Sequence, residues 1–277
     1  MVVGDHRTAS GRVSAPTFLS PEAIVVGETI TLGEDAAHHM RVLRLDVGAP
    51  VQLLDGLGAF GAGTLVRLAK RNASVHVETA VHADPLPPVH VVVPIADRDR
   101  MLWLAEKMAE LGATSWRPVM FKRSRSVTPR GEGTVFHHKV TARMSSALEQ
   151  SRGAWLPQLY PEATLENAIA ATPNGVRLVL DGSGAAVVPS LMALLAAARG
   201  SVPAGGLVPV TVVVGPEGGL EPAELQLLQD SGFRAVTLGR TVLRFETAAV
   251  AGLAVVRAAL DASASPSPSA AVETPDA

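Results

Sequence analysis

The sequence predicts an α/β protein built in two parts, a small N-terminal β-barrel and a larger domain whose parallel sheet is covered by helices. Three observations lead to this prediction. Residues 17–81 contain short runs in which apolar and polar side chains alternate, with turn signals between them. A proline-rich segment, 84–88, then interrupts the pattern. Beyond it, short apolar runs alternate with helical periodicity, as in parallel α/β folds.

The barrel is predicted over residues 15–84. Period-two alternation is clearest in residues 49–54 and 74–78, and Asp55-Gly56-Leu57-Gly58 is a turn signal between strand-like runs. A small β-barrel is the simplest structure for several short strands in succession. Residues 1–14 carry no such pattern and are expected to be flexible. The prolines of 84–88 favour extended backbone, so we place the domain boundary there.

The second domain is predicted over residues 89–262. Short apolar runs predict its strands. Apolar residues three or four positions apart, such as Met101, Leu104 and Met108, predict its helices. Residues 263–277 consist of Ser, Pro, Ala and acidic residues without periodicity and predict a disordered tail. Periodicity alone predicts an unthreaded sheet. The expected strands are 90–95, 118–121, 176–180, 210–214 and 235–238, and the expected helices are 100–111, 135–150, 190–198, 222–231 and 247–260.

Composition excludes several classes of protein. The chain has 277 residues, of which 47% are apolar and 18% are charged, a balance too apolar for a disordered protein. It contains no cysteine, which excludes disulfides, thiolate zinc sites and cysteine nucleophiles. The N-terminus lacks the apolar stretch of a secretory signal, and no apolar run approaches the roughly 20 residues that span a bilayer. The sequence therefore predicts a cytoplasmic protein without a membrane span.

Positive charge is concentrated in the middle of the chain. The net charge is −2, but residues 89–152 hold 11 Lys and Arg against 6 Asp and Glu, between two acidic flanks. Guanidinium groups clustered among hydroxyls suit bidentate contacts with phosphate. A solvated surface loop is the alternative interpretation. We expect this block to bind a partner that carries phosphate, through Lys122, Arg123, Arg125 and Arg130.

A glycine-rich turn follows the strand 210–214. The segment Gly215-Pro216-Glu217-Gly218-Gly219 leads into the helix that Pro222 opens. Glycines at such a turn let a ligand approach backbone amides, at the sheet edge where open α/β folds bind ligands. The turn lacks both the Lys-Ser/Thr pair of a phosphate loop and the G-x-G-x-x-G spacing. It predicts a ligand-binding loop, and the alternative is a tight turn with one exposed glutamate.

Two further corners follow strands. The segment 239–247 leads into the C-terminal helix, which Thr247 is expected to cap, while Arg244 and Glu246 lie beside the free donors of the helix N-terminus. Capping with a surface ion pair is the alternative there. Residues 181–184, Asp-Gly-Ser-Gly, suggest a dinucleotide turn that lacks its third glycine.

The histidines do not predict a metal site. His38-His39 and His137-His138 are adjacent pairs without carboxylates at ligand spacing, so we interpret them as structural or facing RNA, and we expect no metal. The sequence also contains no G-x-S-x-G elbow and no Ser-His-Asp signature, so hydrolase chemistry has no local support.

Taken together, several segments of the sequence resemble the motifs of a known family. Four segments are similar, in the same order, to motifs of the bacterial 16S rRNA (uracil-1498-N3)-methyltransferases of the SPOUT superfamily. The similarity covers roughly residues 17–260 and includes His39 and the Arg41-Val42-Leu43-Arg44 stretch of the N-terminal part. The four segments are Leu111-Gly112 with Pro118, Glu149-Gln150-Ser151 with Pro157, Val214 to Gly219, and Leu238 to Ala248.

The resemblance implies a fold, a cofactor and partners. It implies a PUA-like RNA-binding barrel, a SPOUT α/β domain with a deep trefoil knot, and a homodimer with active sites at the subunit interface. It also implies that S-adenosylmethionine is held bent in the knot and that the substrate is 16S rRNA in the small ribosomal subunit. The implied RNA-binding residues are His39, Arg41, Arg44, Lys122, Arg123, Arg125 and Arg130. The implied cofactor-binding residues are Leu180, Asp181, Val214, Gly215, Glu217, Gly218, Gly219, Leu238, Gly239, Val242, Leu243, Arg244 and Thr247.

The chain departs from the family pattern at two places. Arg152 follows Glu-Gln-Ser directly, where the family usually has one intervening residue, and Gly153 takes the usual arginine position. Phe245 stands where the family often has a small polar residue, and this change would reshape the pocket near the methyl group.

The chemistry of uridine suggests roles for the charged residues. The weakly acidic N3 proton must leave as the methyl arrives, so a cation near the uracil oxygens and a proton acceptor near N3 are needed. We expect Arg244 to supply the cation, with Arg123 or Arg125 second, and Glu246 or Glu217 to accept the proton. The alternatives are an RNA-binding or ribosome-assembly protein without turnover, and a SPOUT methyltransferase that acts on transfer RNA or ribose.

Overall fold

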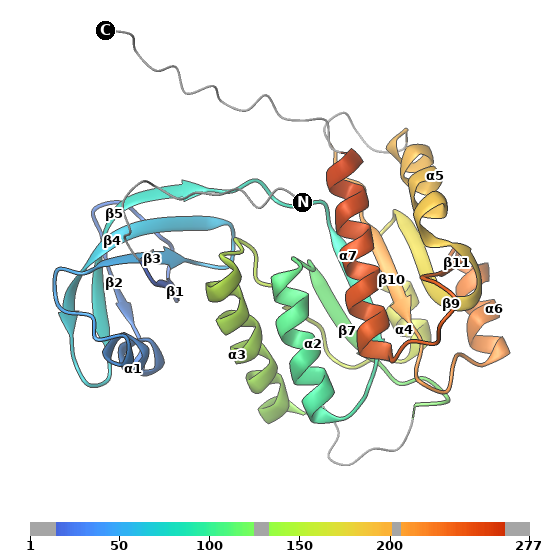
Figure 1. Ribbon diagram of the computed structural model, residues 1–277, viewed down its shortest axis with the longest axis horizontal. Helices are drawn as coiled ribbons and strands as arrows, with labels where there is room; N and C mark the ends of the chain where they lie inside the picture. Colours follow the sequence, from blue (N-terminus) through green and yellow to red (C-terminus); the bar gives the residue numbers. More distant parts are fainter. Residues whose placement is uncertain (1–14, 125–132, 201–205, 264–277) are drawn as a thin grey trace, which may run out of the picture. The chain divides into compact units, whose positions relative to one another are not determined.

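The computed structural model describes residues 15–124, 133–200 and 206–263. Arg125 and Arg130 of the predicted phosphate-binding block lie outside the described residues, as do the predicted flexible N-terminus, 1–14, and all but the first residue of the predicted tail. The chain divides into two compact units at Asp84 and Pro85, and each is described by itself (Figure 1).

The N-terminal unit is a five-stranded sheet with one helix. Its strands pair in the order β1-β3-β4-β5-β2, and β1 pairs with β3 in parallel. Among the described strands β1 and β2 do not pair with each other, so the predicted barrel is a half-barrel with two edges. The elements are β1 (Thr17–Leu19), β2 (Thr29–Leu32), α1 (Glu34–Val42), β3 (Pro50–Leu54), β4 (Ala59–Leu68) and β5 (Ala73–His82).

Helix α1 is absent from the sequence prediction, which expects only strands between residues 17 and 81. The helix turns Ala37 and Met40 into the core of the unit, where both are fully buried. Glu34 and Asp35 occupy its first turn, where carboxylates are stabilised by the helix dipole. A helix of nine residues with two buried side chains carries too short a periodic signal to stand out from neighbouring strands.

The C-terminal unit is a parallel sheet with helices on both faces, as predicted (Figure 1). Its six strands follow the order β11-β9-β10-β6-β7-β8, and every pair is parallel. The sequence did not predict β8 and α4, which span only two and six residues. The strands are β6 (Val89–Pro94), β7 (Ser115–Val119), β8 (Gln158–Leu159), β9 (Val176–Ala186), β10 (Val210–Val214) and β11 (Arg234–Thr237), and the helices are α2 (Arg98–Glu110), α3 (Thr134–Ser151), α4 (Leu165–Ala170), α5 (Val187–Arg199), α6 (Pro222–Asp230) and α7 (Phe245–Ser263).

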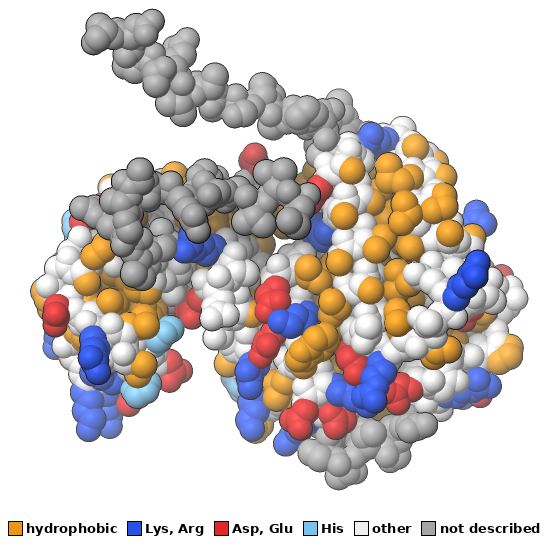
Figure 2. All heavy atoms as spheres, viewed as in Figure 1, with side chains coloured by type: hydrophobic (Ala, Val, Ile, Leu, Met, Phe, Trp, Pro, Cys, Tyr) orange, Lys and Arg blue, Asp and Glu red, His pale blue; other side chains and the backbone are white. Residues whose placement is uncertain are grey.

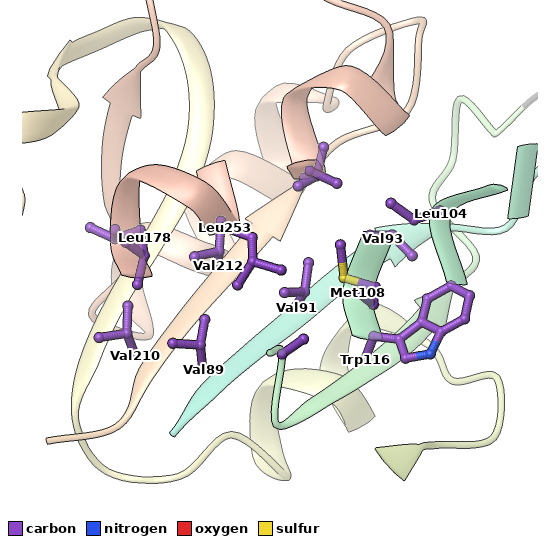
Figure 3. Close-up of a cluster of buried hydrophobic side chains, with 14 of the residues drawn as sticks. Val89, Val91, Val93, Leu104, Met108, Trp116, Leu178, Val210, Val212 and Leu253 are labelled. Carbon is purple, nitrogen blue, oxygen red and sulfur yellow. The ribbon is translucent and has the colours of Figure 1, made fainter. Parts of the chain in front are cut away.

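Alternate residues of the central strands fill two cores. Val89, Val91 and Val93 of β6 pack with α2, α3, α5 and α7 on one face (Figure 3). Val92 and Val213 point to the other face, where α4 and α6 cover them. Burial on both faces is why β10 reads as an unbroken run of β-branched residues rather than an alternating one. These buried strands hold the loops at their carboxyl ends in fixed positions.

Two local predictions are wrong. The strand expected at 176–180 does not end at the Asp181–Gly184 corner, because β9 continues to Ala186. Its pairing with β11 breaks between Ala235 and Val236 and resumes at Ala185 and Ala186. The C-terminal helix begins at Phe245, so Thr247 lies inside its first turn and does not cap it.

The trefoil knot is a property of how the chain threads. Strand β11 pairs with β9 rather than with β10, so the connection from β10 to β11 has to cross over β9. Strand order and pairing do not test threading, and the knot stays a prediction. Among the described helices, none has the length and apolarity needed to cross a membrane.

Candidate functional site

A cavity of about 470 Å³ opens where β10 and β11 end, beside Leu180, Asp181 and Gly182 of β9. The carboxyl edge of a parallel sheet is the usual place for a ligand site, and the volume lies in the range that holds a cofactor-sized molecule. Ten of the thirteen predicted cofactor-binding residues line this cavity, while Gly218, Arg244 and Thr247 do not. The ten are Leu180, Asp181, Val214, Gly215, Glu217, Gly219, Leu238, Gly239, Val242 and Leu243.

Glycine is required in the loop that follows β10. Gly219 has a φ of 74°, in the left-handed region that other residues rarely adopt. A Cβ at Gly215 would lie 3.0 Å from the Leu220 side chain. The loop therefore folds tightly back on itself and presents its backbone to the cavity.

The Asp181 corner contributes an acidic group to the same cavity. The Asp181 carboxylate accepts hydrogen bonds from the backbone N–H of Ser183, at 2.9 Å, and from its hydroxyl. Gly184 then passes so close to β11 that a Cβ there would lie 2.4 Å from the backbone nitrogen of Val236. This approach lets β9 rejoin β11 after the excursion, which is why the corner does not end the strand.

A second, smaller cavity of about 170 Å³ adjoins the first. It lies beyond the end of β6, beside the N-terminus of α2, and it shares Pro216, Glu217 and Phe245 with the larger cavity. Phe245 is only 3% exposed, so its ring is a fixed part of the boundary between the two. Glu217 stands at the junction.

Arg100 is the cation of the smaller cavity, and the sequence analysis missed it. Its Nη1 donates a hydrogen bond to Glu217, and its Nε lies 3.8 Å from the Glu246 carboxylate. The hydrogen bond to Glu217 raises the pKa of Arg100, and the charge of Glu246 adds to this effect. Because 117 residues separate Arg100 from Glu217, no local spacing could have revealed the pair.

Glu246 lies in the first turn of α7 and is mostly buried, with a side chain 12% exposed. Its Oε2 is buried and has no hydrogen-bond partner within the described part of the chain. Glu246 lines neither cavity, whereas Glu217 lines both. The two carboxylates that sequence reasoning could not separate thus occupy different places.

Arg123 packs against the loop after β10. Its Nη1 donates to the carbonyl of Gly218, at 3.2 Å, and its Nε lies 3.3 Å from the Glu221 carboxylate. Glu224 anchors the same segment, because its carboxylate accepts the backbone N–H of Lys122 at 2.8 Å and that of Glu221 at 2.8 Å. The Glu221-x-x-Glu224 spacing is the sequence signal for this anchor.

Arg244 is exposed and lines neither cavity of the described chain. Its carbonyl accepts the N–H of Ala248 at 2.9 Å, so Arg244 immediately precedes α7, between Leu243 and Phe245, which both line the larger cavity. Arg240, which sequence reasoning passed over, lines the larger cavity.

The predicted RNA-binding residues of the N-terminal unit lie together on α1 and the turn that follows it. His39, Arg41 and Arg44 are exposed, and the Arg41 guanidinium donates to the carbonyl of Ala69 at 2.7 Å. The neighbouring Val42 is 64% exposed. This surface combines positive charge with apolar area, as nucleic-acid interfaces do.

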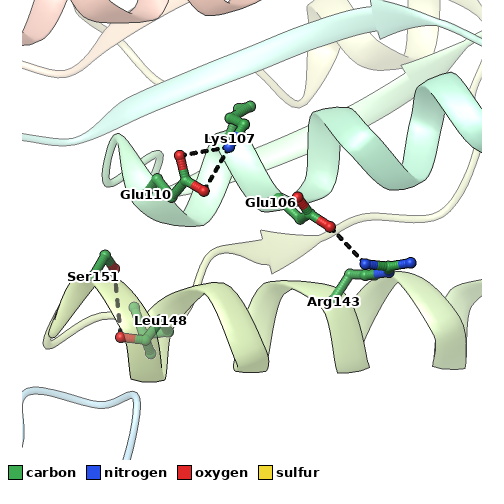
Figure 4. A network of polar contacts seen from close by, with 6 residues as sticks. All are labelled: Glu106, Lys107, Glu110, Arg143, Leu148 and Ser151. Carbon is green, nitrogen blue, oxygen red and sulfur yellow. Dashed lines mark hydrogen bonds and ion pairs between the residues drawn. The ribbon is translucent and has the colours of Figure 1, made fainter.

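The Glu149-Gln150-Ser151 motif ends α3. Ser151 donates to the carbonyl of Leu148 at 3.4 Å, and on the same pair of helices Arg143 of α3 contacts Glu106 of α2 at 2.7 Å (Figure 4). Arg152 then adopts a left-handed conformation with a φ of 56°, which turns the chain out of the helix. The motif lines neither cavity in the described chain.

Comparison with known proteins identifies the family. Residues 83–257 match an RNA methyltransferase domain, and residues 32–78 match an RNA methyltransferase PUA domain. A ribosomal RNA small subunit methyltransferase E from Mycobacterium bovis is 30% identical over 236 residues, which cover 81% of this chain and 84% of the relative. The chain belongs to the ribosomal RNA small subunit methyltransferase E family. The resemblance noted from the four motifs is thereby confirmed.

Further relatives and solved structures resemble this chain. The Synechocystis relative is 29% identical over 88% of this chain and 77% of its own length. A crystal structure of the Neisseria gonorrhoeae enzyme, bound to S-adenosyl methionine, superposes with a TM-score of 0.71 at 28% identity and covers 88% of this chain and 97% of that chain. A Legionella pneumophila methyltransferase structure shares the fold, with a TM-score of 0.74 at 24% identity. Membership confirms the predicted PUA-like unit followed by a SPOUT-type α/β domain.

Proposed function

We propose that this RNA methyltransferase transfers the methyl group of S-adenosylmethionine to N3 of one uridine in 16S rRNA, the position 1498 of the family's name. The observation that carries the proposal is the junction of the two cavities, where Glu217 faces both. The family membership and the S-adenosyl methionine bound to the Neisseria relative support the choice of methyl donor. An rRNA substrate also supports a cytoplasmic location.

The larger cavity fits S-adenosylmethionine. Its aliphatic side chains, among them Leu180, Val214 and Leu238, suit an adenine ring, and the Asp181 carboxylate suits a ribose hydroxyl or an ammonium group. Tight glycine turns expose backbone amides and carbonyls for the polar ends of the molecule. When bound, the cofactor supplies a methyl group on a sulfonium, which needs no metal to activate it.

The charged residues have separate roles in accepting the proton, supplying positive charge and holding the loop. We propose that Glu217 accepts the N3 proton, because it alone among the candidate carboxylates lines both cavities. Glu246 holds Arg100 from the α7 side. Arg244, which follows the cavity-lining Leu243 and is exposed, adds positive charge beside the bound nucleotide. Arg123 fixes the loop that carries Glu217.

Methyl transfer from labelled S-adenosylmethionine tests this proposal. The substrates are small subunits from cells that lack the modification, with already modified subunits, naked 16S rRNA and transfer RNA as controls. We expect incorporation that saturates near one methyl per unmodified subunit. Cofactor binding without incorporation would instead identify an RNA-binding protein without turnover, and labelling of transfer RNA would identify a different substrate.

We expect Lys122 to contribute one phosphate contact to RNA binding. In Lys122→Gln the side-chain charge is lost while the backbone N–H that Glu224 accepts remains. The slope of log K against log salt should fall in magnitude by about 0.7 to 0.9, the value for one phosphate contact. The control is Arg234→Gln, which removes an exposed cation from β11 outside both cavities. Both slopes are measured by filter binding. Equal slopes for Lys122→Gln and the wild type would show that Lys122 makes no phosphate contact with the RNA.

We also propose that the chain acts as a homodimer. The outer face of α7 is a stripe of small residues, Thr247, Ala251, Ala254 and Ala258, all half-exposed or exposed. Hydrophobic side chains gather over α5 and α7 (Figure 2), and Val242 at the rim of the larger cavity is 98% exposed. A second copy would cover this apolar surface and complete the rim.

Replacing Ala254 with glutamate is expected to convert the dimer into a monomer, because the charge would be buried in the interface without a partner. Light scattering after size-exclusion chromatography measures the change. Ala258→Ser on the same stripe is the control and should remain dimeric. A wild-type protein that is monomeric at micromolar concentration would refute the dimer.

A further inference from the structure

The smaller cavity is separate from the one proposed for the methyl donor, although the two share Pro216, Glu217 and Phe245. Its other lining residues are Pro94, Ile95, Ala96, Asp97, Arg100 and Ser124. At about 170 Å³ it falls below the 300–1,000 Å³ typical of sites for larger ligands, and it suits a single ring. Enzymes that modify a base take it out of its stack and hold it in such a pocket. The cavity adjoins the proposed methyl donor site along Glu217 and Phe245.

The polar groups of the cavity complement the edge of a uracil. Arg100 uses Nη1 on Glu217 and has Nε near Glu246, while its Nη2 is engaged by no residue in the described part of the chain. The guanidinium thus retains a donor for a carbonyl oxygen, and the Glu217 carboxylate beside it is an acceptor for an N–H. Uracil presents this combination, because its N3–H lies between two carbonyl oxygens.

We propose that the smaller cavity takes the uracil ring of the target nucleotide and that Arg100 positions it, donating from Nη2 to a uracil carbonyl oxygen while holding Glu217 beside N3. This inference rests on the proposed function and names the residue that sets the base within it. As the methyl arrives, the N3–H bond breaks and the proton passes to Glu217. The N3–methyl bond forms, the methyl–sulfur bond breaks, and its electron pair stays on sulfur. Arg100 stabilises the negative charge that develops on the uracil oxygen.

Phe245 has a defined place in this arrangement. Its ring is buried, yet it lines both cavities, so it forms part of the wall across which base and methyl donor face each other. A flat apolar ring beside a flat base favours stacked or edge contacts. Phe245 is also the position at which the chain departs from the small polar residue common in the family.

A purely structural role for Arg100 makes a different prediction. The Arg100 and Glu217 side chains are 34% and 29% exposed, and ion pairs exposed to solvent contribute little to folding. If the pair only joined α2 to the loop, removing it would leave the rate of methyl transfer unchanged. The turnover number with saturating cofactor therefore separates the two roles.

The test compares Arg100→Gln, Arg100→Lys and the control Lys107→Gln, which removes a paired cation from the same helix outside both cavities. We expect Arg100→Gln to lower kcat on small subunits by about 100-fold or more, the effect of losing one donor to a developing oxyanion. The Kd for S-adenosylmethionine and the Tm should match those of the wild type. Arg100→Lys should recover part of the rate, because a single ammonium can hold Glu217 but not also reach the base. Unchanged kcat in Arg100→Gln, or equal losses of kcat, Kd and Tm, would overturn the proposal.

A second variant tests the pocket rather than the charge. Ala96→Phe places a ring inside the smaller cavity, where Ala96 is a half-exposed lining residue. We expect it to abolish methyl transfer while the Kd for S-adenosylmethionine stays within about twofold. Full activity of Ala96→Phe would show that the base binds elsewhere. Transfer by the wild type to a nucleotide other than uridine would instead overturn the proposed function, and the inference with it.

Discussion

Replacing Glu217 with glutamine should lower kcat for methyl transfer by about 10²- to 10⁴-fold, the range expected when a proton acceptor is lost. The amide keeps the shape of the side chain and a hydrogen-bond acceptor for Arg100, but it cannot take the N3 proton. Because Glu217 also lines the cofactor cavity, the Kd for S-adenosylmethionine has to be measured alongside the rate. Single-turnover kinetics on small subunits isolate the chemical step.

The control for this prediction is Glu106→Gln. Glu106 also pairs with an arginine, Arg143, but on the surface between α2 and α3 and away from both cavities. Its loss should leave kcat unchanged. If Glu217→Gln retained wild-type kcat while Glu246→Gln lost it, the proton would pass to Glu246, whose buried Oε2 has no partner in the described residues.

Replacing Gly184 with alanine should destabilise the protein and weaken binding of the methyl donor. The added Cβ would lie 2.4 Å from the nitrogen of Val236 and 2.5 Å from the carbonyl carbon of Ala235, and backbone atoms cannot move aside as a flexible side chain can. We expect a loss of about 3 kcal/mol in the free energy of unfolding, at the upper end for overpacking. In a unit of this size the Tm should fall by about 6 to 12 °C.

Gly182→Ala is the matched control for thermal unfolding. It lies in the same excursion of β9, and a Cβ at this position would meet nothing within 4 Å. Its Tm should equal that of the wild type. Similar Tm values for the two variants would show that β9 and β11 do not approach each other at Gly184.

The sequence predicted the parallel α/β domain because the signal is local. Strands β6 and β10 are apolar apart from His90 and Thr211, and α2 repeats buried residues at helical spacing from Met101 to Met108. The glycine-rich turn after β10 was also predictable, since Gly215 and Gly219 serve backbone geometry. Strand β8 has only two residues, and α1 turns only Ala37 and Met40 into the core, so neither gave a visible periodic signal.

The rest depends on contacts between distant parts of the chain. Arg100 meets Glu217 across 117 residues, and Arg123 meets Glu221 across 98. Arg257 is a third case: it is the one arginine in an apolar stretch of α7, and it donates to the carbonyls of Pro87 and Gly112. Burial lowers its pKa to about 10, so it stays charged at neutral pH. Sequence spacing does not reveal such pairs, because the two residues come together only when the sheet has folded.

The proposed arrangement of the site requires that the methyl group be added to N3 of uridine. Small subunits from cells without the modification are incubated with the protein and S-adenosylmethionine, and the modified nucleotide is located and identified by mass spectrometry of rRNA fragments. We expect N3-methyluridine at a single position of 16S rRNA, with no product when S-adenosylmethionine is omitted. A methyl group on ribose, on C5 of a pyrimidine or in another RNA would contradict it.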